Sequence, residues 1–253
     1  MSINNSKSGL QNLLTSILSV ANQDQNLYLS PSIFSSMVNT VTSFLIDKCV
    51  ELYPQSPALL DIIDPFVKIA AITPSGGIIQ LPDDYRNIVG SPSIIVKGDK
   101  KGECGDVGVP ITNAQQFLTA NLKGGCTRRP ITIVAQSEFD YLTTSSYKRP
   151  TYWDPIAYNA GRNNEGKSQL KVCPYDITKC YLMYVKQEQI YNFGYMMQPD
   201  DSFYIDPTTT VDTEWTNASF TSLFKGINHL YGIYSRDKEF SAWAMALSQI
   251  SLV

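Results

Sequence analysis

The segment between residues 149 and 186 most constrains the fold, because it holds a complete phosphate-loop motif inside a pattern typical of β-strands. Gly161, Gly166, Lys167 and Ser168 satisfy G-x-x-x-x-G-K-[ST]. In that motif backbone N–H groups cradle a phosphate, the lysine reaches the terminal phosphates, and the hydroxyl holds magnesium. The site requires a helix that begins at the lysine, since the helix N-terminus faces the phosphate.

The residues around the motif predict a hairpin instead. Residues 155–158 and 170–173 read as two short strands, and Pro174 stops the second run where a helix would have to continue. Residues 161–166 are Gly, Asn and charged residues, as expected of the connecting loop. The alternation of residues 180–186 predicts a third strand, so we expect a β-meander.

The alternative is a P-loop nucleotide hydrolase centred on Lys167. Such a site also needs an apolar strand that ends in a magnesium-binding aspartate. Residues 203–206 (FYID) meet this demand poorly, because the run is short and leads straight into Pro207. The hairpin is therefore the preferred interpretation, since the motif counts only in a strand, loop and helix context.

Composition favours a protein that acts through contact surfaces. The 253 residues suit one large domain or two small ones with a substantial core. Charged residues make up 17%, below the roughly one quarter typical of soluble domains, and there are 15 tyrosines. A formal net charge of −3 gives no global attraction to nucleic acid or to an anionic membrane.

The cysteines predict neither a zinc site nor a disulfide framework, because they are odd in number and include no C-x-x-C pair. They are Cys49, Cys104, Cys126, Cys173 and Cys180. The polar start of the chain has no secretory signal pattern, and no run of about 18 apolar residues spans a bilayer. We expect a reducing cytoplasm during synthesis and no membrane partner.

Hydrophobic periodicity predicts an α+β fold in the order helix, sheet, helix. Helical ends pack together around or beside a central antiparallel sheet or sandwich with long loops. The expected domains are an N-terminal helical segment, a β-rich middle domain and a C-terminal helical segment that packs with the first. Their boundaries are 1–63, 64–212 and 213–253.

Individual elements follow from spacing and caps. Apolar residues predict a helix from Leu10 to Leu18, and Ser30 with Pro31 begins a second helix that ends near Cys49. The C-terminal segment predicts a helix from Trp215 to Tyr234 and a second one after it. In the middle we expect a hairpin of residues 66–72 and 78–81, strands at 93–96 and 131–135, and a short helix at 114–122.

No residue set predicts a catalytic, cofactor-binding or metal site, and we expect no enzymatic turnover. His229, the only histidine, fits a solvated helix position better than a general base. Three carboxylate pairs are better explained as caps and turns than as cation ligands: Asp61 and Asp64, Asp83 and Asp84, Asp200 and Asp201.

Glycines and basic residues also have ordinary explanations. Gly102, Gly105 and Gly108 lack the spacing of a dinucleotide fingerprint and indicate a loop. The basic clusters would suit a DNA backbone or an acidic partner, but solvated loops are the simpler explanation. They comprise Lys123, Arg128, Arg129, Lys148 and Arg149.

Several short motifs resemble virion proteins of tailed bacteriophages, in particular the ring or head-to-tail adaptor proteins of crAss-like phages. They are LPDDY at 81–85, RPT at 149–151 before PIAY at 155–158, LKVCP at 170–174, YLMYV at 181–185 and Glu214-Trp215. The resemblance covers most of the chain from about Phe66, and the long GKS-bearing loop departs from it.

The resemblance implies a structural protein without cofactors, located in the neck or tail region of the virion. Its expected partners are further copies of itself in a homo-oligomeric ring of about twelve subunits, the portal protein, and tail or neighbouring ring proteins. Phage DNA would pass through the ring without specific binding. A second alternative is a carbohydrate-binding module of a tail appendage, suggested by Tyr152 and Trp153.

Overall fold

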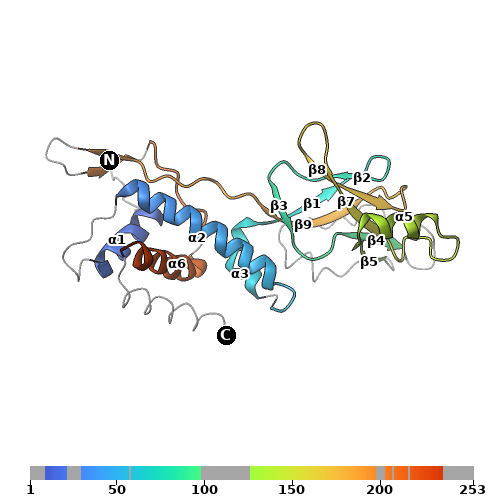
Figure 1. The fold of residues 1–253 in the computed structure, drawn as a ribbon, viewed down its shortest axis with the longest axis horizontal. Coiled ribbons are helices and arrows are strands. Elements are labelled where there is room, and N and C mark those ends of the chain that lie inside the picture. Colours follow the sequence, from blue (N-terminus) through green and yellow to red (C-terminus); the bar gives the residue numbers. More distant parts are fainter. Residues whose placement is uncertain are drawn as a thin grey trace. The chain divides into compact units, whose positions relative to one another are not determined.

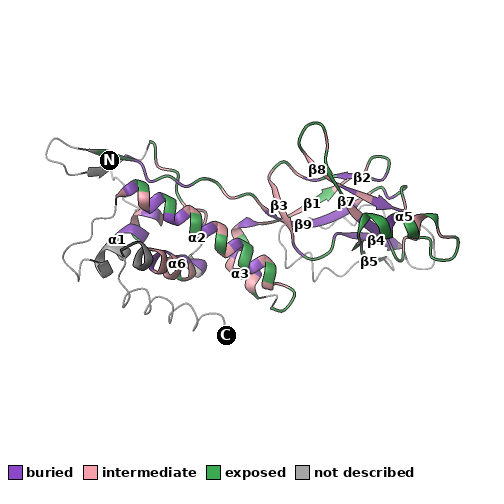
Figure 2. Cartoon of the chain, in the orientation of Figure 1, coloured by how far each residue is buried: buried purple, intermediate pink, exposed green. Residues whose placement is uncertain are grey.

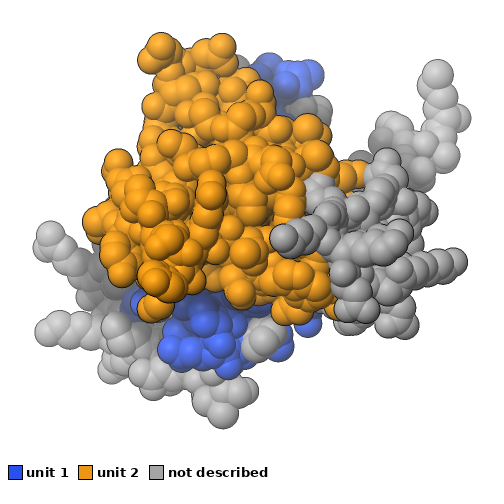
Figure 3. Space-filling view, turned by 90° about the vertical axis from the view of Figure 1, so that its right-hand side faces the viewer, with its two compact units in different colours: residues 1–65, 188–253 blue, residues 66–187 orange. Residues whose placement is uncertain are grey.

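The structure is a computed structural model that describes residues 9–21, 30–56, 58–97, 126–197, 203–206, 208–215 and 217–235 (Figure 1). It contains both helices and antiparallel sheets, so the predicted α+β class is confirmed. The chain divides into two compact units, which Figure 3 colours separately. The helical unit comprises Met1–Pro65 and Glu188–Val253, and the sandwich unit comprises Phe66–Gln187.

The helical unit contains the predicted N-terminal and C-terminal helices. Its elements are α1 (Gly9–Ala21), α2 (Pro31–Leu52), α3 (Leu59–Ile62), α6 (Asn217–Ser235) and the strand pair β10 (Tyr195–Met197) and β11 (Phe203–Ile205). Ser30 caps α2 as predicted: its hydroxyl accepts the N–H of Ile33 at 3.3 Å, and Pro31 occupies the first turn. The second C-terminal helix expected after residue 237 lies outside the described residues.

The helices pack together, as the sequence predicted, and α6 contacts α1, α2 and α3. Buried and exposed positions alternate along α2, with its buried side including Phe34, Val38 and Ile46 (Figure 2). On α6 the buried residues include Leu223 and Ile227. α2 and α6 approach closely at a glycine of α6, Gly226, where a Cβ would press into the Val41 side chain of α2.

The sandwich unit consists of two facing sheets. The first has the order β1 (Val67–Ile72), β9 (Cys180–Lys186), β4 (Ser93–Lys97) and β5 (Cys126–Pro130), with β3 (Tyr85–Ile88) also on β9, and all pairs are antiparallel. The second has the order β2 (Ile78–Gln80), β8 (Ser168–Cys173), β7 (Ile156–Arg162) and β6 (Thr132–Ile133), with only β6 and β7 parallel.

Side chains from both sheets interlock in the core of the sandwich. Ile94, Leu182 and other residues of the first sheet meet Leu170 and Val172 of the second. The outer face of the second sheet is covered by α5 (Gln136–Thr144), whose Phe139 packs on Ile156 and Cys173. On β9 the residues between the inward-facing ones, Met183 and Val185 among them, are buried too, so this strand is covered on both faces.

Two predicted strand pairings are wrong, although the strands themselves exist. The strands that correspond to residues 66–72 and 78–81 do not form a hairpin, because β1 pairs with β9 and β2 pairs with β8. A tight turn does separate them, and Gly77, at φ 77°, lies where a Cβ would strike the Tyr175 side chain. The turn redirects the chain from one sheet to the other.

The predicted meander is also wrong in its last step. β7 and β8 pair as expected, but β9 joins β1, β3 and β4 in the opposite sheet. β9 is buried on both faces, so its apolar pattern does not indicate which of the two sheets it joins.

One predicted strand is shorter than expected, and one helix was not expected. The strand predicted at 131–135 is only the two-residue β6, and α5 was not predicted at all. The helix expected at 114–122 lies outside the described residues. The two units meet at residues 65/66 and 187/188, whereas the sequence analysis placed the boundaries at 63/64 and 212/213.

Candidate functional site

The loop with the phosphate-loop spelling is the connection of the β7–β8 hairpin, as predicted (Figure 1). Asn163 organises it. Its side-chain Oδ1 accepts the N–H groups of Glu165 at 3.0 Å and Lys167 at 2.9 Å, and its backbone oxygen accepts that of Gly166 at 2.9 Å. The N–H of Asn163 in turn donates to the oxygen of Lys167 at 2.9 Å.

These hydrogen bonds occupy the backbone N–H groups that a bound phosphate would need. The N–H groups of residues 165–167 already have acceptors inside the turn, and the N–H of Gly161 donates to Asn159 Oδ1 at 3.0 Å. Ser168 begins strand β8, so no helix N-terminus faces the loop. The arrangement therefore holds a turn, and it does not have the geometry of a phosphate cradle.

Lys167 is engaged with a neighbour that the sequence analysis did not link to it. Its Nζ lies 3.1 Å from Oδ1 of Asp83, and this hydrogen bond and charge raise the pKa of Lys167. Asp83 precedes β3 and lies close to residues 81 and 168, where the N–H of Leu81 donates to the oxygen of Ser168 at 3.0 Å. The lysine thus joins the hairpin to the turn before β3.

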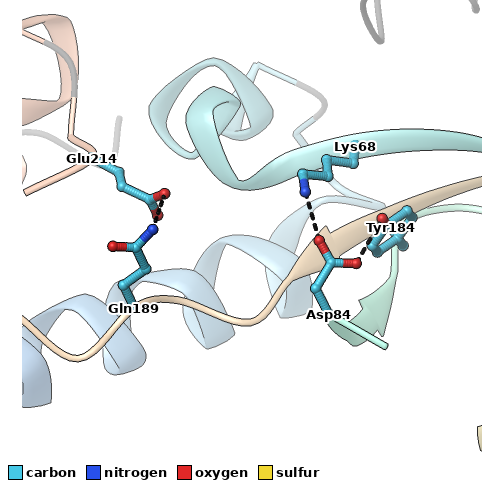
Figure 4. A network of polar contacts seen from close by, with 5 residues as sticks. All are labelled: Lys68, Asp84, Tyr184, Gln189 and Glu214. Carbon is cyan, nitrogen blue, oxygen red and sulfur yellow. Dashed lines mark hydrogen bonds and ion pairs between the residues drawn. The ribbon is translucent and has the colours of Figure 1, made fainter. Parts of the chain in front are cut away.

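A second polar network surrounds Asp84 (Figure 4). Its carboxylate accepts Lys68 Nζ at 2.6 Å and the Tyr184 hydroxyl at 2.9 Å. Burial opposes ionisation of Asp84, but the hydrogen bonds and the lysine charge outweigh it and lower the pKa. Burial, followed by the bond to Asp84, raises the pKa of Tyr184.

The carboxylate pair at 83 and 84 is thus a turn with two separate partners, as the sequence analysis favoured. Asp61 and Asp64 are both exposed, on α3 and at the start of the following short helix. Asp200 and Asp201 lie outside the described residues, as do the three loop glycines and Lys123. Among the described residues no three His, Cys, Asp or Glu side chains cluster as metal ligands would.

His229 lies on α6, as predicted, but it is half-buried rather than solvated. Its Nδ1 is buried and makes no hydrogen bond within the described part of the chain. The neighbouring Asn228 is 1% exposed, and neither of its side-chain polar atoms is bonded to described residues. Sequence periodicity gave no signal for either burial.

The cysteines whose side chains are described are buried thiols outside any disulfide: Cys49, Cys173 and Cys180. Burial raises the pKa of Cys49 to about 11. Burial also raises the pKa of Cys173, although the charge of Arg149 opposes the shift. Because the thiolate is the reactive form, these two thiols are poor nucleophiles at neutral pH.

The two segments of the helical unit are joined by polar bonds that sequence analysis did not find. The Asp212 carboxylate accepts the N–H groups of Gly9 and Leu10, both at 2.9 Å, and so caps α1 from 202 residues or more away along the chain. Asn39 on α2 exchanges two hydrogen bonds with the backbone of Tyr191, at 2.8 and 2.9 Å.

Two further hydrogen bonds join α2 to the C-terminal segment of the helical unit. Ser35 Oγ accepts the N–H of Phe193 at 2.9 Å, and Trp215 Nε1 donates to Thr42 Oγ1 at 3.0 Å. Within the C-terminal segment itself, Gln189 Nε2 donates to Glu214 at 3.4 Å (Figure 4). Side chains of α2 thus hold the extended segment that leads to α6.

The sandwich unit presents basic and aromatic side chains on β5 and on the loop before β7. The guanidinium of Arg129 stacks 4.3 Å from the centre of the Trp153 ring. The loop that carries Trp153 also carries Lys148 and Arg149, both exposed, and Tyr147, which is 98% exposed. We call these five residues the basic face. Arg128 and Arg129 lie on strand β5, whereas the sequence analysis placed them in a loop.

Charge is divided unevenly between the two units. The helical unit has 5 Lys and Arg against 13 Asp and Glu, a formal charge of −8. The sandwich unit has 15 Lys and Arg against 10 Asp and Glu, a formal charge of +5. The net charge of −3 conceals this division, which becomes visible only when the unit boundaries are known.

No model of a protein family matches the sequence, and no curated protein matches it significantly. None of the described helices has the length and apolar character needed to cross a membrane. The functional inference therefore depends on the motifs and on the surfaces just described.

Proposed function

We propose that the chain is a structural virion protein, a subunit of a head-to-tail connector ring between the portal and the tail of a bacteriophage. The short motifs that resemble crAss-like ring and adaptor proteins support it. Three of them, at 81–85, 170–174 and 181–185, contribute core residues of the sandwich: Leu81, Val172 and Leu182 are all buried there. The motifs that carry the resemblance therefore contribute to the apolar core of the sandwich unit.

The observation that carries the proposal is the presence of large exposed apolar side chains on both units. The helical unit exposes Phe44, Ile190, Tyr195, Met196 and Val211, and the sandwich unit exposes Ile78, Ile133, Tyr141, Tyr147, Trp153 and Tyr175. A subunit of a closed ring needs two different contact faces, one for each neighbour. Aromatic and Met side chains are enriched at the centres of such contacts.

In this role the protein acts through the fit between neighbouring subunits, and its polar networks stabilise the fold. Asn163 shapes the β7–β8 turn, Asp84 joins β1 to β9, and Asp212 caps α1. A net negative charge on the assembled ring is compatible with DNA passage, since the protein does not attract the phosphate backbone as a whole.

Imaging of purified phage particles tests the proposal. We expect the chain in density between portal and tail, in several copies arranged around the channel. Mass spectrometry of the same particles measures its copy number relative to the portal. Purified, intact particles that lack the chain would contradict the proposal.

A further inference from the structure

We propose that the basic face of one copy docks on the acidic α2–α3 surface of a second copy of this chain. The inference rests on the proposed function, because it assigns the two neighbour-contact faces of a ring subunit. It follows from the opposite charges of the two units and from the side chains that each unit exposes.

The division of charge favours contact between unlike units of different copies. A helical unit of charge −8 repels another helical unit, and two sandwich units of charge +5 repel each other. A helical unit placed against a sandwich unit of the next copy brings opposite charges together. Repetition of that contact from copy to copy is the heterologous, head-to-tail arrangement from which rings are built.

The basic face is prepared for an acidic partner. Arg129 is held over Trp153, and its Nε is buried without a hydrogen bond to any described residue. A guanidinium stacked on an indole keeps its planar donors oriented, which suits a carboxylate. Lys148 and Arg149, on the loop that carries Trp153, are both exposed.

The acidic surface is formed by the C-terminal half of α2 and by the short helices that follow it. Phe44, Asp47 and Glu51 recur three and four residues apart and are all exposed, so they share one side of α2. Glu51 pairs with the exposed Lys48 at 2.9 Å and so adds no net charge to this side. Phe44 is 61% exposed. Asp61 on α3, which packs beside α2, and Asp64 add two exposed carboxylates.

The two surfaces therefore match in residue type as well as in charge. One presents an exposed phenyl ring among carboxylates, and the other presents Trp153 and Tyr147 among three cations. Aromatic residues and Arg contribute most of the binding energy in protein contacts, and rim charges set partner choice and association rate.

Charge reversal on each surface tests the contact with the full chain. One variant carries Lys148→Glu and Arg149→Glu, and the other carries Asp47→Lys and Asp61→Lys. Each variant alone meets like charge with like charge, so we expect its self-association to weaken roughly tenfold or more relative to wild type. An equal mixture restores both contacts, since the two variants can alternate, and should associate about as tightly as wild type.

Sedimentation velocity over a concentration series measures the association, and circular dichroism checks the fold of each variant. The control is Arg162→Glu with Lys167→Glu, which makes the same charge change on the β7–β8 hairpin. It should associate as wild type does. Raising the salt concentration to about 0.5 M should weaken wild-type association, because the attraction is between exposed charges.

Several outcomes would overturn the docking proposal. They are a monomeric wild type at all concentrations, variants that associate normally, and a mixture that fails to recover. Loss of DNA binding in the Lys148→Glu, Arg149→Glu variant with unchanged self-association would assign the basic face to nucleic acid instead. The proposed function fails separately, if imaging finds no copies in particles, whatever these association measurements show.

Discussion

The two units differ in what stabilises each of them internally. The sandwich unit is one continuous segment, with one apolar cluster between its two sheets and a smaller cluster under α5. The helical unit is assembled from two segments separated by 122 residues, Phe66–Gln187, and side chains of α2 bond the backbone of the returning segment. The comparison teaches that apolar burial between two sheets holds the first unit, whereas the second also depends on particular polar side chains.

The difference is not one of loop length. The sandwich also pairs distant segments, since β1 and β9 lie more than 100 residues apart along the chain. In the helical unit, the side-chain bonds of Asn39 and Asp212 fix which backbone groups of the two segments meet. Removal of one such side chain should therefore affect the helical unit alone.

The largest expected effect comes from Trp215→Ala. Trp215 is 7% exposed and donates to Thr42, so its loss leaves a cavity and an unpaired buried hydroxyl. We expect the free energy of unfolding of the helical unit to fall by about 3–5 kcal/mol. Hydrogen exchange with mass spectrometry resolves the units: peptides of residues 30–56 and 217–235 should exchange faster, and those of 66–97 and 126–187 should not.

Trp153→Ala is the matched control in the sandwich unit. Trp153 is 37% exposed and its described contact is the stack with Arg129, so the loss should be about 1 kcal/mol or less. Equal destabilisation of both units by Trp215→Ala would mean that they unfold as one body, and the contrast drawn here would be wrong.

A smaller effect is expected from Asn39→Asp. The carboxylate keeps an acceptor for the N–H of Tyr191 but loses the amide donor that bonds the oxygens of Tyr191 and Ser35. Two acceptor groups are then left facing a new negative charge, which should cost the helical unit about 2 kcal/mol. Thr40→Ala, one residue along α2, removes only a bond to Ser36 within the helix and serves as the control in urea unfolding.

The pH dependence of the sandwich unit should be smaller still. The pKa of Asp84 is lowered in the folded state, so its contribution to stability is present above about pH 4 and is lost as the pH falls further. The pKa of Tyr184 is raised, so its contribution is present below about pH 10 and is lost as the pH rises through the folded-state value.

Asp84→Asn tests both limbs at once. The side chain of Asp84 is 38% exposed, so solvent screens the ion pair with Lys68 and the stability change should remain below about 1 kcal/mol. Unfolding midpoints measured from pH 3 to 11 should vary less in the variant than in wild type. Asp83→Asn, which leaves the three-residue network intact, should keep the wild-type profile; an unchanged profile in Asp84→Asn would exclude the network as its source.

The sequence predicted most helices and strands, but it did not predict the partners of several strands. α1, α2, α6 and the strands β1, β4, β7, β8 and β9 were found from periodicity and caps. The partners of β1 and β2 were wrong because either sheet of a sandwich can receive a strand with one apolar face. The partner of β9 was wrong because this strand is buried on both faces, which indicates neither sheet. α5 was missed because Phe139 is its one buried residue, too little for a helical pattern.

The candidate surfaces were less predictable than the elements. The hairpin around Lys167 was predicted because Pro174 excludes a helix, but the part played by Asn163 depends on a turn geometry that a single Asn does not specify. Asp212, Asn39 and Thr42 bond groups more than 150 residues away, which no local pattern reveals. The basic face was visible only as separate Arg and Lys residues, since the Arg129 stack on Trp153 joins two distant segments.

The smallest expected effect is that of Lys167→Ala, and it separates the two meanings of the motif. The Lys167 side chain is exposed and its ion pair with Asp83 is screened by solvent, so the unfolding midpoint of the sandwich unit should not change measurably. Asn163→Ala is the matched variant: it removes the acceptor of two backbone N–H groups and should lower that midpoint. Isothermal titration with Mg²⁺ and ATP or GTP should show no binding to wild type or to either variant, because the turn already uses its N–H groups. Binding to wild type that disappears in Lys167→Ala would show that the loop rearranges around a phosphate, and the sandwich unit would then depend on particular polar residues just as the helical unit does.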